Sequence, residues 1–198
     1  MKRHINTIER SGRIFSFKSA RQDGAVSVLS LEPPDTHYLS AAQGWIGLGN
    51  WSEAAAELDK IRPIMRAHPD VLEIKYRLCA IADKWTEAML ICRTLTHLAP
   101  DRPFGWLNFS VALNKLDRTR EAYNMLLPVL ERFPNDSLIR YALARYACRQ
   151  GLQKEASVWL HRAFDLGDPF QMMTAALNDP GLQPLWAELG VPTSAPTP

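Results

Sequence analysis

The side chains best suited to acid–base, nucleophilic or metal chemistry are five histidines and three cysteines. They are His4, His37, His68, His97, His161, Cys79, Cys92 and Cys148. No two of them have a spacing typical of metal ligands, and the sequence has no GxSxG, HExxH or glycine-rich phosphate loop. Catalysis would require these residues to converge from separate segments, and their spacing does not indicate that. We therefore predict a protein that is not an enzyme and uses no cofactor or metal.

The remaining chemistry is non-covalent recognition. An arginine can pair a carboxylate with two hydrogen bonds, and an asparagine can bond the backbone of an extended peptide. Which arginines and asparagines act together depends on the elements that hold them. Those elements are indicated by an internal repeat, which is sought before any local motif.

The dipeptide Glu-Ala recurs at a spacing of 34 residues, with its alanines at Ala54, Ala88, Ala122 and Ala156. Four residues after each alanine is an apolar side chain: Leu58, Cys92, Leu126 and Leu160. Three further on is another: Ile61, Leu95, Val129 and Ala163. Five residues before each alanine is a turn-forming residue: Gly49, Asp83, Asp117 and Gly151. An apolar stripe with this spacing is one face of a helix, and the upstream residue ends the helix before it.

The pattern predicts helix pairs over 36–48 and 52–67, 70–82 and 86–98, 103–115 and 119–132, and 137–150 and 153–166. Each glutamate of the dipeptide falls in the first turn of a second helix, where a carboxylate is favoured by the helix dipole. Pro63 and Pro128 lie inside predicted second helices. Each is expected to kink its helix or end it early, because proline lacks a backbone N–H.

The chain resembles the tetratricopeptide-repeat (TPR) family, whose unit is a helix–turn–helix of about 34 residues. The third unit matches best, with Trp106, Phe109, Leu113, Ala122, Leu126 and Pro134 on the family's columns. In the second unit Tyr76 replaces the small residue of the family. The resemblance implies an all-α, right-handed superhelix of four repeats at 35–68, 69–102, 103–136 and 137–168. Residues 169–190 are expected to form a C-terminal cap, and 191–198 a disordered tail.

In TPR arrays the first helices of successive units line a concave groove. The resemblance therefore implies a peptide-binding surface with an apolar and polar lining: Gln43, Arg77, Leu107, Asn108, Asn114, Tyr141 and Arg145. Such a lining suits an extended protein segment with an acidic group and one or two apolar side chains. The alternative is that the arginines pair locally, for example Arg77 with Glu73. The carboxylate clamp of chaperone-binding TPR domains is not matched in either frame, so binding to heat-shock-protein tails is not expected.

Residues 1–34 are expected to form a basic arm that is either flexible or a short hairpin with strands at 13–17 and 25–31. Phe15 and Phe17 near Lys18 and Arg21 allow a second interpretation, a nucleic-acid-associated regulator that uses this arm. A narrower version of the first interpretation is a secretion-type TPR chaperone. A homodimer is also possible, since no predicted helix covers the first repeat.

Composition limits these alternatives. Hydrophobic residues make up 46% and charged residues 22%, which is ordinary for a globular chain. The net charge of +2 is too small to indicate nucleic acid or an anionic membrane as the main partner. No apolar run reaches the ~20 residues of a membrane span. Three unpaired cysteines favour a reducing compartment, so we predict a cytoplasmic protein with a protein or peptide partner.

Overall fold

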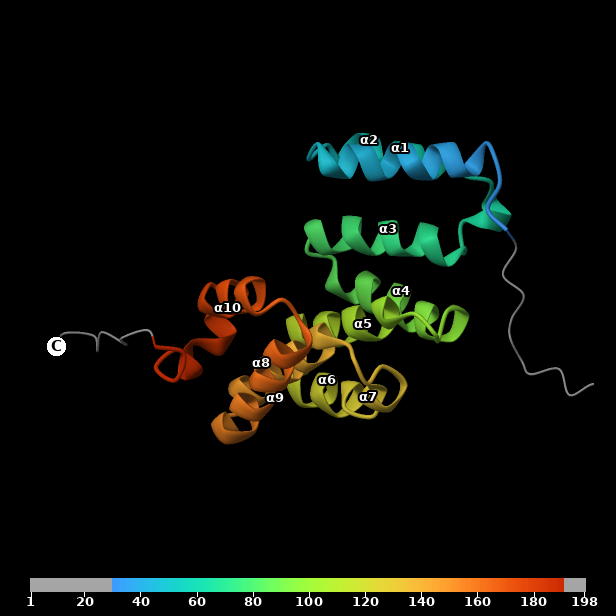
Figure 1. Cartoon of the computed structure of the whole chain (residues 1–198). Helices are drawn as coiled ribbons and strands as arrows, with labels where there is room; N and C mark the ends of the chain where they lie inside the picture. The colour runs from blue at the N-terminus through green and yellow to red at the C-terminus, as the bar shows by residue number, and fades with distance from the viewer. Residues whose placement is uncertain (1–29, 191–198) are drawn as a thin grey trace, which may run out of the picture.

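The computed structural model describes residues 30–190, and this part of the chain consists of helices and the turns between them (Figure 1). The predicted strands at 13–17 and 25–31, most of the basic arm and the tail at 191–198 lie outside the described residues. No helix among those described is long and apolar enough to cross a membrane.

The four predicted helix pairs are confirmed. They are α1 (Asp35–Gly47) with α2 (Trp51–Lys60), α3 (Pro69–Ile81) with α4 (Trp85–Leu98), α5 (Pro103–Lys115) with α6 (Thr119–Leu126) and α7 (Val129–Arg132), and α8 (Ser137–Arg149) with α9 (Gln153–Leu166). A shorter helix, α10 (Pro169–Leu177), and a 3₁₀ segment, η2 (Pro180–Leu185), follow them. The chain is therefore all-α over the described residues.

Both prolines interrupt their second helices. The helix α2 ends at Lys60, and Pro63 begins the short 3₁₀ segment η1 (Pro63–Met65). Pro128 separates α6 from α7. Since a proline cannot donate the hydrogen bond that would continue the helix, the predicted spans 52–67 and 119–132 were too long as single helices.

The turn inside each repeat uses the left-handed backbone region. The four turn residues have φ angles of +74° at Gly49, +54° at Asp83, +60° at Asp117 and +77° at Gly151. Glycine adopts this conformation without a steric penalty, and aspartate is among the residues that tolerate it best. The shared conformation explains why only glycine and aspartate occupy this column.

The alanine ladder is buried along its whole length. Ala54, Ala88, Ala122 and Ala156 are each 0% exposed. The apolar residues four positions later are also buried, because they lie on the same helix face. Each alanine lets the neighbouring helix approach closely, and the larger side chains fill the space around that contact.

Tyr76 is accommodated without a small residue. Its ring is buried in a cluster with Ala88, Cys92 and Ala112, and it meets Phe104 edge-on at 5.6 Å between centroids. The neighbouring alanines supply the space that a small residue would otherwise have left. The first helix pair packs in a separate hydrophobic cluster with Val71 and Ile74 of α3.

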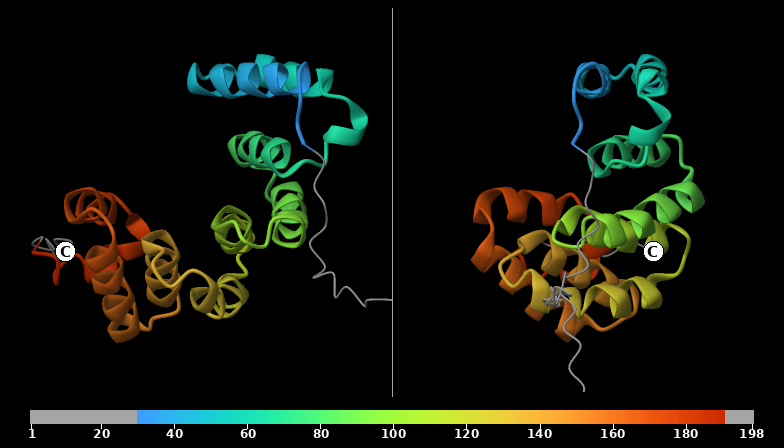
Figure 2. Two further views of the ribbon diagram at one scale, coloured as in Figure 1. Left: turned by 45° about the vertical axis from the view of Figure 1, so that its right-hand side comes forward. Right: turned by 90° about the vertical axis from the view of Figure 1, so that its right-hand side faces the viewer.

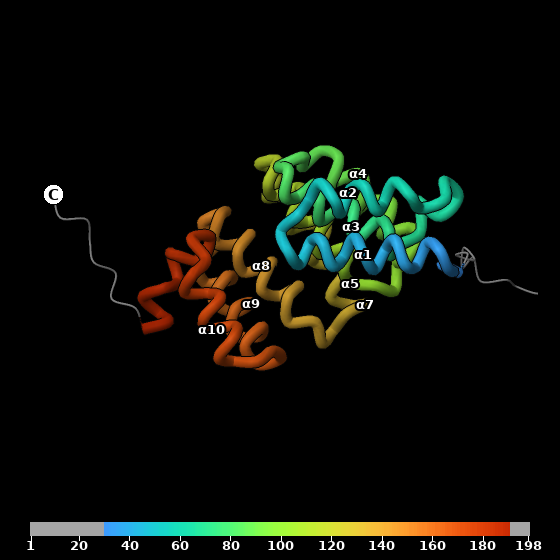
Figure 3. The backbone as a smooth tube through the Cα atoms, turned by 90° about the horizontal axis from the view of Figure 1, so that it is seen from above, coloured from blue at the N-terminus to red at the C-terminus, as the bar shows by residue number. Residues whose placement is uncertain are grey.

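The helix pairs form a curved stack. Figure 2 shows an arc with α1 and α2 at one end and α10 at the other, and with α3 and α5 on its inner side. Seen from above in Figure 3, α8, α9 and α10 lie to one side of the earlier helices. The first helix of each pair therefore faces the concave side of the arc.

Asp35 connects the two ends of the first helix pair. This buried carboxylate accepts hydrogen bonds from the backbone N–H of Arg62 at 3.0 Å and from Arg62 Nε at 2.7 Å. The bond from the backbone N–H, together with the guanidinium, lowers the pKa of Asp35 below its ordinary value.

This lowered pKa predicts a loss of stability in acid. The folded form binds the Asp35 proton more weakly than the unfolded form, so its contribution is complete above the ordinary aspartate pKa of about 4 and is lost as pH falls through the lower folded value. Chemical denaturation between pH 6 and pH 3 should show a smaller acid dependence for Asp35→Asn than for the parent. Identical pH profiles would contradict the assignment.

Candidate partner-binding groove

The concave side carries one residue column from each first helix. Gln43, Arg77, Val111 and Arg145 are spaced by 34 residues and occupy equivalent positions on α1, α3, α5 and α8. Gln43 and Arg77 are exposed, Val111 is partly exposed, and Arg145 is partly buried. The column thus changes from open at the N-terminal repeats to enclosed at the C-terminal repeat.

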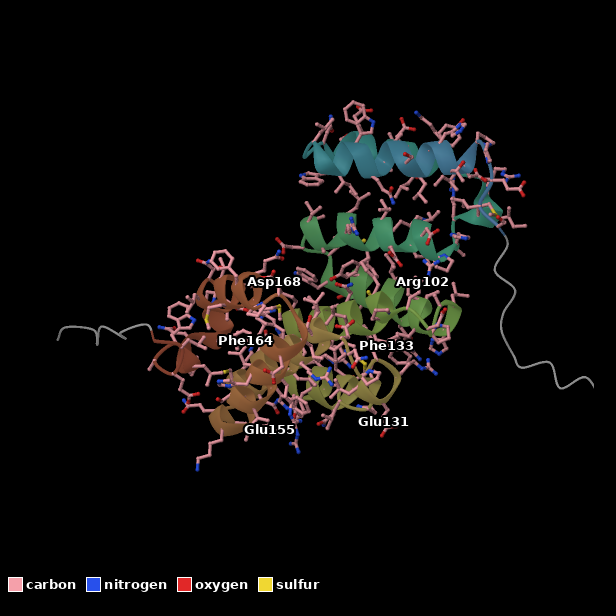
Figure 4. The ribbon with its side chains drawn as sticks, in the orientation of Figure 1. Arg102, Glu131, Phe133, Glu155, Phe164 and Asp168 are labelled. Atoms are coloured by element: carbon pink, nitrogen blue, oxygen red, sulfur yellow. The ribbon has the colours of Figure 1, made fainter. Side chains whose placement is uncertain are left out.

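Arg77 does not pair with Glu73. Glu73 lies 3.5 Å from Nη1 of Arg102, and the same Arg102 atom also pairs with Asp70. Arg102 lies in the turn before α5, beneath α3 (Figure 4). Burial raises the pKa of Glu73, and the Arg102 charge opposes that effect. The arginine of the next repeat, and not Arg77, therefore neutralises Glu73.

The middle of the predicted site is partly engaged within the protein. Leu107 is partly buried against the C-terminal core cluster. Asn108 Nδ2 donates to the carbonyl oxygen of Phe104 at 2.9 Å. The amide oxygen of Asn108 has no hydrogen-bond partner among the described residues, so it remains a possible acceptor for a peptide N–H.

Asn114 is buried, with 8% of its surface exposed. Its Oδ1 accepts from Thr119 Oγ1 at 2.8 Å and from Arg149 Nη1 at 3.2 Å. It thereby connects the end of α5 to the start of α6 and to α8. The backbone carbonyl of Asn114 also accepts from Arg149 Nη1, at 3.3 Å.

Tyr141 and Arg145 share one acidic partner. Tyr141 Oη donates to Asp179 Oδ2 at 3.1 Å, and Arg145 Nε lies 2.6 Å from the same oxygen. The Nε–H of Arg145 is not aligned with that oxygen, so the contact is an ion pair without hydrogen-bond geometry. Burial, reinforced by the Asp179 charge, raises the pKa of Tyr141 well above its ordinary value. The phenol is therefore a neutral donor at physiological pH.

Asp179 was not among the predicted site residues, although the sequence contains a signal for it. It follows Arg145 by 34 residues and continues the column Gln43, Arg77, Val111, Arg145 into the C-terminal cap. Its Oδ1 also accepts from the backbone N–H of Gly181 at 2.9 Å, which fixes the start of η2.

The cap is a firmly packed part of the fold. Leu182 and Leu185 of η2 are 0% and 1% exposed and belong to the cluster that contains Leu143, Ala147 and Tyr146 of α8. Figure 2 shows η2 on the inner side of the arc, next to α8. The cap therefore closes the C-terminal end of the concave face.

Between α5, α8 and the cap lies a hollow of about 540 Å³. Its lining includes three cationic side chains with Asn114 and two residues of the cap: Lys115, Arg145, Arg149, Asn114, Asp179 and Gly181. The two helices are held beside it by a buried hydrogen bond of 2.9 Å between Ser110 Oγ and Tyr146 Oη. Cys148 also lines the hollow, and burial raises the pKa of its thiol to about 11, so the thiol stays protonated at neutral pH.

The structure therefore brings three of the seven predicted residues, Asn114, Tyr141 and Arg145, to one end of the groove with Asp179 as a common neighbour of the last two. Gln43 and Arg77 lie on the earlier repeats, away from this end. Whether these residues contact a partner stays a prediction. Within residues 30–190 no group of three His, Cys, Asp or Glu side chains could hold a metal ion.

Comparison with solved structures defines the class of fold. The TPR protein TTC0263 from Thermus thermophilus has a TM-score of 0.64 and 16% identity, over 79% of this chain and 83% of that chain. PilF from Pseudomonas aeruginosa has a TM-score of 0.64 and 18% identity, over 78% and 68% of the two chains. MamA from Desulfovibrio magneticus, residues 41 to the end, has a TM-score of 0.61 and 17% identity, over 81% and 93%.

No protein-family model and no curated protein sequence matches the chain. The helix pairs, the 34-residue period and the structural similarity together show a TPR-like helical repeat. The predicted fold class is confirmed.

Proposed function

We propose that this protein is a non-enzymatic protein–protein interaction module that holds an extended segment of a partner on its concave face. The observation that supports this proposal is the column on the four first helices. It places Gln43, Arg77 and Val111 along one face of the arc, with exposed or partly exposed side chains. A strip of separated polar and apolar side chains suits an extended peptide better than a small molecule.

The concave face can be tested without knowing the partner. A photo-crosslinking residue would be placed at Gln43 or at Val111 in the full chain, and at Lys154 of α9 as a control. Lys154 is exposed on a second helix, outside the groove column. After irradiation in the native cell, protein adducts should form from the first two positions and not from Lys154.

Arg77 provides a second test of the same face. It is exposed and has no ion-pair partner among residues 30–190, so Arg77→Glu reverses a charge with little expected effect on folding. Crosslinking from Gln43 should fall at least about fivefold if an acidic partner residue lies near Arg77, which corresponds to about 1 kcal/mol. Equal adduct yields at all three positions, unchanged by Arg77→Glu, would contradict the proposed face.

A further inference from the structure

The hollow between α5, α8 and the cap carries more positive than negative charge. Three cations line it, Lys115, Arg145 and Arg149, and Asp179 is the one acid in its lining. Asp117, which pairs with Arg149 Nη2 at 2.5 Å, is outside that lining and 83% exposed at its side chain. The enclosed part of the site is therefore short of anionic groups.

Arg145 is held in place while part of its guanidinium stays accessible. Its Nε is buried beside Asp179, but 34% of the side chain is exposed. Neither terminal nitrogen has a hydrogen-bond partner among residues 30–190. The backbone of Gly181 passes close by, and a Cβ at this position would lie 3.4 Å from Nε. The guanidinium therefore offers two preoriented donors beside the hollow.

Lys115 and Arg149 complete the positive lining. The ammonium group of Lys115 lies 5.2 Å from the centre of the Trp85 ring, and no acidic side chain of the described part of the chain pairs with it. Arg149 Nη1 is bound to both oxygens of Asn114, which orients its guanidinium. Two neighbouring repeats thus direct cations toward one enclosed space.

We propose that this hollow binds the carboxylate of a glutamate or aspartate side chain in the partner segment. The chain itself supplies a precedent, because Asp179 already places a carboxylate against Arg145 from the adjacent column position. A nucleic-acid phosphate is less favourable, since Asp179 in the wall would repel a more highly charged group and the cations form no extended stripe. The proposal rests on the concave face as the partner surface and adds the chemistry of its C-terminal end.

Two matched peptides test it with the full-length protein. One is a fluorescein-labelled, C-terminally amidated dodecapeptide with four glutamates and three leucines, and the other has glutamine in place of each glutamate. Fluorescence polarisation gives the affinity. NMR signals of the Arg145 and Arg149 Nε–H groups and of the Gly181 amide report the location. The glutamate peptide should bind at least about tenfold more tightly, and these three signals should shift.

Three variants separate binding from stability. Lys115→Gln and Arg149→Gln should each weaken the glutamate peptide about three- to tenfold, whereas Lys154→Gln should not. Asp179→Asn should strengthen it about threefold or more, because it removes the competing carboxylate. A cap that was merely loosened would not bind the peptide more tightly.

Several outcomes would overturn the proposal. These are equal binding of the two peptides, shifts confined to other helices, a requirement for a free C-terminal carboxylate, or tighter binding of a single-stranded oligonucleotide. Crosslinking at Gln43 and Val111 could still succeed in each of these cases. Failure of the carboxylate site is therefore distinguishable from failure of the concave face itself.

Discussion

Replacing Asp179 with alanine is expected to lower the free energy of unfolding by about 2–3 kcal/mol. The substitution removes the partner of Arg145 Nε, the acceptor of the Tyr141 hydroxyl and the acceptor of the Gly181 N–H. It leaves a partly buried guanidinium without its counter-charge, which is the most costly of these losses. Equilibrium denaturation in urea measures the effect, and hydrogen exchange should show the loss first in α10 and η2.

Two further substitutions control for the contributions of charge and capping. Asp179→Asn keeps an oxygen that can accept from Gly181 and Tyr141, so it should lose less stability than Asp179→Ala. Asp165→Ala removes an exposed acid on α9 that has no ion-pair partner among residues 30–190, and it should change stability by less than about 0.5 kcal/mol. If Asp179→Ala were no more destabilising than Asp165→Ala, the proposed role of Asp179 in holding the cap would be wrong.

Replacing Ala122 with leucine should cost about 2–3 kcal/mol of unfolding free energy. Ala122 is 0% exposed at the close contact of α6 with its neighbours, beside Leu113 and Leu143 in the same cluster. Three extra carbon atoms there must displace packed side chains or separate the helices, because protein interiors have little spare volume.

Ala55 offers the matched control. It is exposed and lies next to the buried Ala54 on α2. Ala55→Leu introduces the same side chain without an enclosed site, so its urea midpoint should be close to that of the parent protein. Similar losses at Ala122 and Ala55 would show that the ladder does not mark the tightly packed faces.

Helix positions were predictable because they depend on short-range spacing. The 34-residue period, the buried alanines and the left-handed turns at Gly49, Asp83, Asp117 and Gly151 all follow from local rules for helices and turns. The interruptions at Pro63 and Pro128 also follow, since a missing backbone donor is a property of the residue itself.

The side-chain pairs of the groove were less predictable. Arg77 and Glu73 are one helical turn apart, but Glu73 pairs with Arg102, which lies 29 residues further along the chain. Asn114 is on a first helix, but its amide oxygen is used by Thr119 and Arg149. Sequence spacing identifies residues that share a face, whereas the nearest partner across two helices depends on how those helices are placed.

The sequence by itself determined the repeat, its boundaries and the faces that must be buried, because one apolar stripe per helix can be satisfied only by stacking the units. The position of the cap was decided by the tertiary structure. After α10 the chain turns at Asp179, and Leu182 and Leu185 become buried beside α8. That burial brings Asp179 against Tyr141 and Arg145 and creates the positively charged hollow. The direction of a short segment after a helix depends on the long-range burial of a few side chains, and no local period in the sequence encodes it.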